Sequence, residues 1–154
     1  MSADINRAIA PDGSTVLHAA LLDGEVAEIR SLLARGADPH QTWVTWLQPD
    51  PVSPLYFAVH QDQAEMARLL YAAGARLSPE EQDELLMHVC VDGSVPMVAL
   101  LLEIGCSLEA ICPETGFQPL HQALWAANEQ VAVELIRAGA DVNSSSAGGF
   151  TPLL

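Results

Sequence analysis

The sequence predicts an all-α protein built from repeated pairs of short helices, and three observations support this. First, four segments each place a leucine 19 residues before a glycine. Second, apolar residues within each segment recur three or four positions apart, which is the spacing of one helix face. Third, each segment has a turn near its middle and ends at a glycine suited to the left-handed position after a helix. The four segments are residues 17–36, 55–74, 86–105 and 120–139.

The first segment illustrates the helix pair. Leu17, Ala20 and Leu21 share one face of a first helix, and Gly24 marks the turn that follows. A second apolar helix then ends before Gly36. Neither helix can bury its apolar face alone, so neighbouring pairs must stack, and this predicts a solenoid.

Motifs around these helices resemble the ankyrin-repeat family, whose units of about 33 residues carry T-P-L-H-x-A before the first helix. The matching stretches are TVLHAA (15–20), SPLYFA (53–58), QPLHQA (118–123) and TPL (151–153), and after the second helices RGADPH (35–40), AGA (73–75) and AGADVN (138–143). The resemblance implies an all-α ankyrin-repeat solenoid of stacked helix-turn-helix units with projecting hairpin loops.

We expect a single ankyrin-repeat domain over residues 1–154. Its repeats are expected at about 13–40, 52–77, 79–108 and 116–143, with a partial fifth at 149–154. Because the sequence stops just after the start of the fifth motif, we expect a product trimmed from a longer protein. The alternative is that the last residues merely cover the fourth repeat.

The connection after the first repeat departs from the family pattern. From Gly36 to Leu55 it spans 19 residues, where the period implies about 14. It contains Trp43 and Trp46 and two prolines, so we expect a loop that projects from the repeats. Two alternatives stay open for the tryptophans: they bind a partner, or they form a small core of the loop itself.

The second connection is short and lacks turn residues. Ser78, Pro79 and Glu81 are typical of a helix start, with serine as the cap and glutamate three residues later. We therefore expect a longer inner helix in the third repeat and a missing or shortened hairpin before it. Asp62 and Ala127 occupy turns where other repeats have glycine, and Asn128 is expected to supply the second of these turns.

The charge excludes several classes of partner. The chain has 20 acidic residues against six arginines and no lysine, a net charge of −14. Residues 77–136 hold ten acids and no arginine or lysine. Such a surface repels nucleic acids and anionic membranes, and without lysine there is no Gly-Lys-Ser/Thr phosphate loop. A stretch of about 18 apolar residues, a secretory signal and a CxxC pair are all missing from the sequence, so we expect a reduced, cytoplasmic protein.

The residues that carry chemistry favour structural roles, and we expect no catalytic residue, metal or cofactor. His88 and Cys90 are two apart in a helix and therefore diverge. His18 and His121 match the motif histidine, which in the family braces its own repeat. The acidic run 80–84 suits a helix start better than a metal site. Cys90 is expected in the core, and Cys106 and Cys112, which flank a hairpin, are expected to be partly exposed.

Recognition is the remaining function, and the resemblance implies that ligands lie in a concave groove between hairpin tips and inner helices. Trp125 is the strongest candidate, because aromatic anchors dominate binding energies; the alternative is that it packs against a neighbouring repeat. The candidates are Leu21, Leu22, His60, Gln61, Val91, Asp92, Trp125 and Ala126 on the inner helices, and Trp43, Trp46, Asp50, Glu114, Thr115, Phe117 and Phe150 on the hairpins.

The sequence thus predicts a non-enzymatic protein–protein interaction module with an acidic, aromatic-bearing concave face. Its charge favours a protein partner with a basic surface. This suits an inhibitor or immunity protein that occludes a basic partner such as a toxin. The alternative is a fragment of a longer ankyrin scaffold, or a regulatory domain that covers another domain. We expect a monomer when the protein is free.

Overall fold

The computed structural model describes residues 4–45 and 49–152. This part of the chain contains eight α-helices and, apart from one isolated β-bridge, no β-structure. The all-α prediction is therefore confirmed for the described residues. The chain divides into two compact units, residues 1–76 and 77–154, each of which contains two helix pairs. The single domain over the whole chain stays a prediction.

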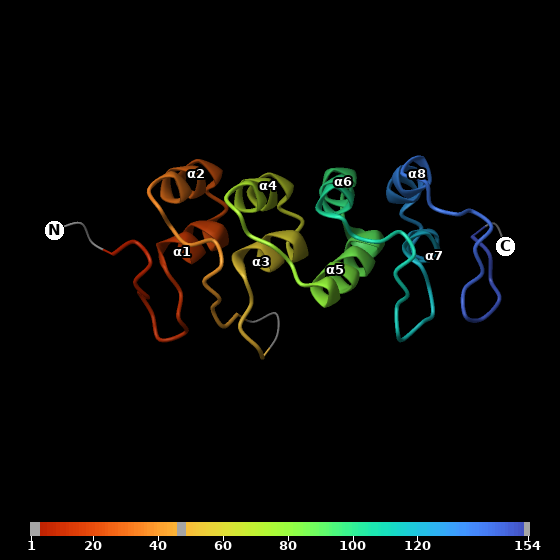
Figure 1. Ribbon diagram of the computed structural model, residues 1–154, viewed down its shortest axis with the longest axis horizontal. Helices are drawn as coiled ribbons and strands as arrows, with labels where there is room; N and C mark the ends of the chain where they lie inside the picture. Colours follow the sequence, from red (N-terminus) through yellow and green to blue (C-terminus); the bar gives the residue numbers. More distant parts are fainter. Residues whose placement is uncertain (1–3, 46–48, 153–154) are drawn as a thin grey trace. The chain divides into compact units, whose positions relative to one another are not determined.

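The first unit has an inner and an outer layer of helices (Figure 1). The inner helices are α1 (Val16–Asp23) and α3 (Pro54–His60), and the outer helices are α2 (Val26–Ala34) and α4 (Ala64–Ala72). Helix α1 packs on α3 and α2 on α4. The core between them is made of fully buried aliphatic and aromatic side chains, among them Leu17, Leu21, Ile29, Leu55, Phe57 and Leu70.

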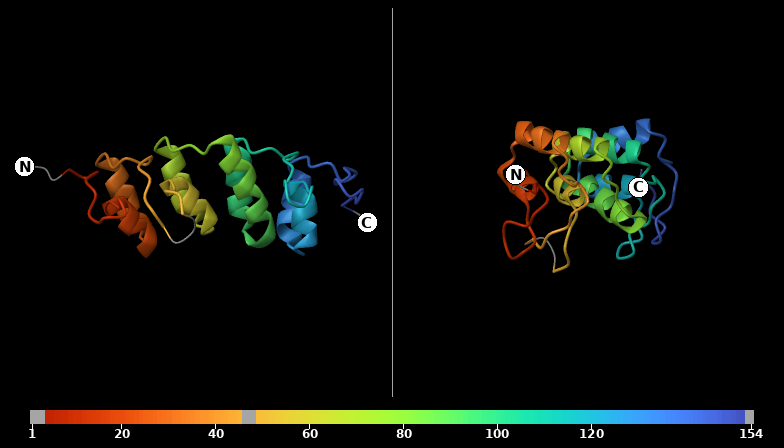
Figure 2. Two further views of the ribbon diagram at one scale, coloured as in Figure 1. Left: turned by 90° about the horizontal axis from the view of Figure 1, so that it is seen from below. Right: turned by 60° about the vertical axis from the view of Figure 1, so that its left-hand side comes forward.

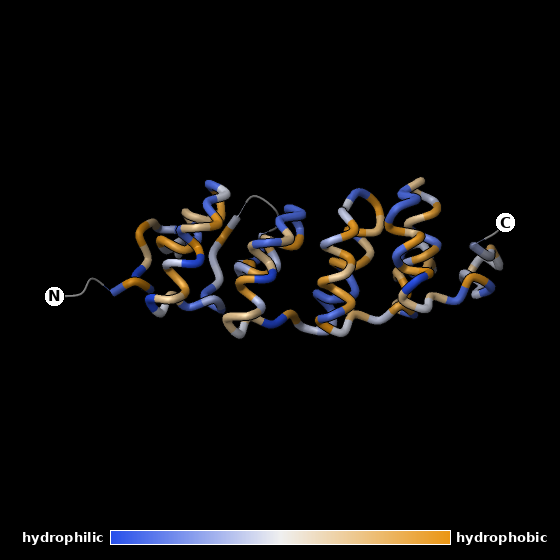
Figure 3. Tube along the Cα trace, turned by 90° about the horizontal axis from the view of Figure 1, so that it is seen from above, coloured by the Kyte–Doolittle hydropathy of each residue, from blue (hydrophilic) through white to orange (hydrophobic). Residues whose placement is uncertain are grey.

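The second unit repeats this arrangement with α5 (Pro79–Asp92), α6 (Val95–Ile104), α7 (Pro119–Trp125) and α8 (Glu129–Arg137). The inner helices α5 and α7 lie side by side, and α6 packs on α8 (Figure 2). Apolar and polar positions alternate along α5 and α8 in Figure 3, as in amphipathic helices that bury one face, whereas α6 is apolar at almost every position. In the described part of the chain, the longest helix has 14 residues and none is long and apolar enough to span a membrane.

The long inner helix α5 begins where the sequence predicts. The Ser78 hydroxyl accepts a hydrogen bond from the Glu81 backbone N–H at 3.2 Å, and the Ser78 N–H donates to the Glu81 carboxylate at 2.7 Å. Pro79 holds the first helical position. Helix α5 has 14 residues, where α3 and α7 have seven. Only residues 73–78 separate α4 from α5, so the expected shortening of the hairpin is confirmed.

The glycines that end the four segments all have the left-handed conformation that the sequence predicts, with φ between 93° and 108°. The turn before α8 differs from the prediction. Ala127 itself is left-handed, with φ of 57°, whereas Asn128 has φ of −83°. The Asn128 side chain instead accepts a hydrogen bond from the Val131 N–H and donates one to the Gly93 carbonyl at 3.1 Å. Asn128 therefore caps α8 and ties it to the end of α5.

The first finger, residues 37–53, is the long connection between the first two helix pairs. Trp43 and Val52 pair across it through two backbone hydrogen bonds of 2.9 and 3.1 Å. The Trp43 ring is 2% exposed and lies 4.1 Å from the His18 ring and 5.2 Å from the Phe57 ring, between centroids. The prediction that Trp43 binds a partner is wrong, because these rings cover it. Trp46 lies outside the described residues.

Two buried histidines hold the fingers to the helices. The Thr15 backbone N–H donates to Nδ1 of His18 at 2.8 Å, so the proton of the neutral ring is on Nε2, which donates to the Gln41 carbonyl at 2.7 Å. In the second unit, Nε2 of His121 donates to the Phe150 carbonyl at 3.0 Å. Each histidine therefore also fastens the finger that follows its own repeat.

Truncation of Trp43 tests its place in the core. Trp43→Ala should lower the free energy of unfolding by about 3–5 kcal/mol, because it removes the ring that fills the space between His18 and Phe57. Val44→Ala is the matched control, since its side chain is 46% exposed, and it should cost less than about 0.5 kcal/mol. Urea titration followed by circular dichroism measures both. Equal losses in the two variants would contradict the assignment.

The buried His18 should make stability depend on pH. Burial lowers the pKa of His18 from its usual 6.5, so the unfolded chain takes up a proton at a higher pH than the folded chain. Stability should then fall as the pH drops below 6.5 and should be insensitive to this group above neutral pH. His18→Gln should flatten this dependence. Urea midpoints of the wild type and of His18→Gln, measured over this pH range, give the pH dependence of stability for each protein. The same pH dependence in both would disprove the role of His18.

Candidate binding groove of the second unit

One face of α5 carries both acidic and apolar side chains. Residues 80, 83, 84, 87, 88 and 91 recur with the helical period, since each has another member of the set three or four positions away, and they therefore share this face. With the tip of the second finger, residues 106–118, they form a hollow of about 620 Å³, which we name the acidic pocket. It is lined by Glu80, Asp83, Glu84, Met87, His88, Val91, Ile111, Cys112, Pro113, Glu114 and Gln122.

The acidic pocket combines negative charge with an apolar floor. Four carboxylates surround it, and neither arginine nor lysine lines it. Met87 forms part of the floor, while Val91 is 40% and Ile111 62% exposed. Such a surface matches a long cationic side chain, which packs its methylene groups on apolar atoms and keeps its charge beside the carboxylates.

The second finger is held in a defined shape. The Cys112 N–H donates to the Phe117 carbonyl at 2.9 Å, and the Gly116 N–H donates to the Cys112 carbonyl at 2.8 Å. The third finger, residues 140–152, is joined to it by a hydrogen bond from the Ala147 N–H to the Gly116 carbonyl. Gly116 has φ of 68°, and a Cβ at this position would collide with the Ala147 side chain. Glycine is therefore required where the two fingers meet.

The two fingers and α7 enclose a second hollow of about 560 Å³, which we name the aromatic pocket. The Phe117 ring lies 5.9 Å from the Trp125 ring and 5.9 Å from the His121 ring, between centroids. Trp125 is 79% exposed and Phe150 62% exposed. The lining residues are Thr115, Phe117, His121, Leu124, Trp125, Phe150, Thr151 and Pro152.

Several residues predicted for the groove meet in these two pockets. Val91 and Glu114 line the acidic pocket, and Phe117, Trp125 and Phe150 line the aromatic pocket. The exposure of Trp125 excludes the alternative in which it packs against a neighbouring repeat. Their role in binding a partner stays a prediction.

Other predicted residues lie elsewhere. Asp50, His60 and Gln61 belong to the first unit, where the His60 ring stacks on Tyr56. Asp92 is exposed at the end of α5 and lines neither pocket. Leu21 is fully buried in the core, so its assignment to the groove is wrong.

The sequence predicts an acidic face but does not assign Glu80, Asp83 and Glu84 to it. It assigns them to the helix start, whereas of this run it is Glu81 that forms the cap. The helical periodicity of the sequence does place Glu80, Asp83 and Glu84 on the same face as Val91, because steps of three and four residues backward from Val91 lead to all of them.

The three cysteines have different surroundings. Burial raises the pKa of the Cys90 and Cys106 thiols to about 12. Cys106 is therefore a core residue, and the expectation that it is partly exposed is wrong. Cys112 is partly exposed, as predicted, and a hydrogen bond from Thr115 lowers the pKa of its thiol.

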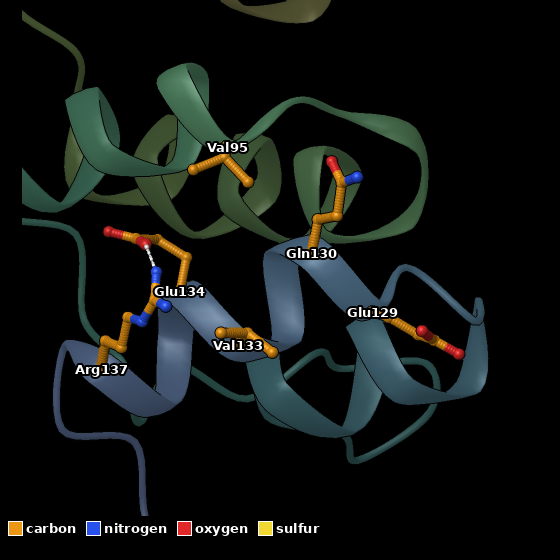
Figure 4. Close-up of a pocket in the computed structure, with 6 residues that line it drawn as sticks. All are labelled: Val95, Glu129, Gln130, Val133, Glu134 and Arg137. Carbon is orange, nitrogen blue, oxygen red and sulfur yellow. Dashed lines mark ion pairs between the residues drawn. The ribbon is translucent and has the colours of Figure 1, made fainter.

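A third hollow, of about 360 Å³, lies on the outer helices α6 and α8 (Figure 4). Its acidic lining is partly neutralised, because Glu134 pairs with Arg137 at 3.8 Å. Val95 and Val133 supply its apolar surface. The described residues include no group of three or more histidine, cysteine or acidic side chains placed to hold a metal ion. The acidic pocket and the aromatic pocket are therefore the candidate functional site.

Comparison with known sequences identifies the family. The family described as ankyrin repeats (3 copies) matches residues 55–146. The chain belongs to the ankyrin-repeat family. Both the predicted resemblance and the predicted all-α repeat solenoid are thereby confirmed, and ankyrin repeats make the protein a protein–protein interaction module.

Individual ankyrin-repeat relatives differ greatly in length. An ankyrin repeat and KH domain-containing protein of Caenorhabditis briggsae is 28% identical over 153 residues, which are 96% of this chain and 6% of that protein. A fowlpox virus (strain NVSL) protein described as an ankyrin repeat protein is 29% identical over 122 residues, 79% of this chain and 82% of the viral protein. The transient receptor potential cation channel subfamily A member 1 of Drosophila melanogaster is 29% identical over 107 residues, 66% of this chain and 9% of the channel. The chain thus spans less than a tenth of two of these relatives.

Thiol labelling tests the geometry of the second finger. Iodoacetamide at mildly alkaline pH should modify Cys112 first, because the thiolate is the reacting form and this thiol is both accessible and more acidic than usual. Cys90 and Cys106 should react only after unfolding in urea. Peptide mass spectrometry of timed samples measures the order, and early labelling of Cys106 in the native protein would contradict the structure. Thr115→Val should slow the labelling of Cys112, since it removes the hydroxyl that stabilises the thiolate.

Proposed function

We propose that the second unit binds a basic segment of a partner protein in its groove, with the acidic pocket holding cationic side chains. The observation that carries this proposal is the acidic pocket itself, with four carboxylates around a partly exposed apolar floor and no arginine or lysine among its lining residues. Residues 77–136 contain no arginine or lysine, and Arg137 at the end of α8 pairs with Glu134 and does not line the acidic pocket.

The electrostatics of this unit suit rapid and selective association. Its net charge attracts a basic surface over roughly one Debye length, about 8–10 Å in physiological salt. Charge pairs at the rim of an interface chiefly raise the association rate and select the partner, while buried apolar contacts supply most of the affinity. The acidic pocket offers both kinds of contact.

A compact, acidic module of this kind suits an inhibitor or immunity protein that covers the active surface of a basic partner, such as a toxin. We propose that it acts without catalysis, as a monomer when free, because like-charged copies repel one another. We place it in the cytoplasm, where its three free thiols stay reduced. The match with the fowlpox virus relative covers 82% of that protein, which supports a role for such repeats outside very long proteins.

A second candidate function is that of a segment in a longer ankyrin scaffold or regulatory protein. The relatives from Caenorhabditis briggsae and Drosophila melanogaster support it, since the matching region is 6% and 9% of their lengths. In that case the groove would position or cover another domain of the same protein, and the same acidic pocket would receive a basic segment in cis.

Removal of two carboxylates tests the acidic pocket. The probe is a fluorescent peptide with alternating arginine and glycine, measured by anisotropy at low salt. Asp83→Asn with Glu114→Gln should weaken binding by about tenfold, which corresponds to about 1.4 kcal/mol, because two charges beside the peptide are lost.

The control variant carries Glu109→Gln and Glu129→Gln, two exposed acids of the same unit that lie outside the acidic pocket. It has the same net charge as the pocket variant and should bind nearly as tightly as the wild type. Equal weakening in both variants would show a diffuse charge effect and contradict the pocket. Affinity that does not change with added salt would contradict the electrostatic account.

A further inference from the structure

We propose that the aromatic pocket receives an apolar side chain from the same partner segment whose cationic side chain enters the acidic pocket. The partner segment would then be bipartite, with arginine or lysine close to an aromatic or branched aliphatic residue. This inference rests on the proposed function and adds a second specificity to it.

The aromatic pocket has the composition of an anchor site. Three aromatic rings come from three different elements: Phe117 from the second finger, Trp125 from α7 and Phe150 from the third finger. Two hydrogen bonds hold these rings in place. The buried His121 donates to the Phe150 carbonyl, and the Gly116 carbonyl of the second finger accepts from the Ala147 N–H of the third. Trp125 and Phe150 nevertheless remain largely exposed. Covering large exposed rings releases free energy roughly in proportion to the apolar area removed from water, so these rings suit an anchor site.

The lining favours an apolar occupant over a cation. No carboxylate lines the aromatic pocket, whereas four line the acidic pocket. A guanidinium in the aromatic pocket would lose hydration without a charged partner, and a ring face returns only part of that cost. Two of the polar groups nearby are already engaged, since the Thr115 hydroxyl accepts from the Phe117 N–H and Nε2 of His121 donates to the Phe150 carbonyl. Nδ1 of His121 is buried without a hydrogen-bond partner, and it carries no charge that would compensate a guanidinium. The two pockets therefore select different side chains.

The two pockets are close enough for one segment. Glu114 of the acidic pocket and Thr115 of the aromatic pocket are consecutive residues of the second finger. Gln122 and Trp125 are three residues apart on α7, which is roughly 4.5 Å along the helix axis. An extended chain advances about 3.3 Å per residue, so a segment of a few residues reaches both pockets.

Charge also favours a foreign segment over a second copy of this chain. The acidic groove lies in a part of the sequence without positive charge, so two copies would bring like charges together. A partner rich in arginine or lysine removes that repulsion. The occupant that fits both pockets is thus a basic segment with an apolar anchor.

A phenylalanine scan tests this proposal. The probes are peptides of equal length that contain two arginines in a glycine-serine background, with one phenylalanine moved through every other position. At one or two positions, phenylalanine should tighten binding to the wild type by about tenfold relative to the peptide without it. This gain, measured in each variant against its own binding of the peptide without phenylalanine, should disappear in Trp125→Ala and Phe150→Ala.

Ile136→Ala is the control, because Ile136 is an exposed apolar residue of the same unit that lies outside both pockets. It should keep the full gain. Failure of the arginine peptides to bind the wild type at all would overturn both the proposed function and this inference. Binding that depends on Asp83 and Glu114, but shows no gain at any phenylalanine position, would overturn this inference alone. A larger gain from a third arginine in place of phenylalanine would assign a cation to the aromatic pocket. A dimer seen by analytical ultracentrifugation, and lost in Trp125→Ala, would assign the pocket to a second copy.

Discussion

No helix pair in this protein can bury its apolar face alone, and the rest of the structure depends on that constraint. Seven of the eight helices in the described part of the chain have seven to ten residues, a length at which an isolated helix is marginal in water. Each is stable because α1 packs on α3, α2 on α4, α5 on α7 and α6 on α8. This packing uses one face of each inner helix. In the second unit, the opposite face and the fingers remain available for binding.

The buried histidines explain how loops without regular structure become parts of a defined site. His121 reaches from α7 to the backbone of the third finger and thereby fixes Phe150 at the pocket that Trp125 also lines. His18 does the same for the first finger, where Trp43 covers its ring. In the first unit this arrangement buries Trp43 in the core, whereas in the second unit Trp125 and Phe150 stay exposed to solvent.

The sequence predicts the repeats, the cap at Ser78, the length of α5 and the left-handed glycines, because each depends on local residues and a repeated spacing. It also predicts Val91, Glu114, Phe117, Trp125 and Phe150 at the groove through their register in the repeat. It does not decide whether Trp43 is buried or binds a partner. The burial of Trp43 depends on contacts with His18 and Phe57, which are both distant from it in the sequence. The acidic pocket was missed because an acid near a helix start has a sufficient local explanation, and only packing against the second finger reveals its second role.

The two pockets of the groove arise from one departure from the regular repeat. The helix start at Ser78 extends α5 by about two turns at its beginning, and these turns carry Glu80, Asp83 and Glu84 to the finger tip. In a repeat with an inner helix of seven residues, as in α7, these positions would lie in a hairpin. The extension therefore adds negative charge on one side of the second finger, while α7 places Trp125 on the other. Because charge and aromatic surface are separated by this finger, we propose that the groove distinguishes a cationic from an apolar side chain, so that a partner gains from both only when it presents them together.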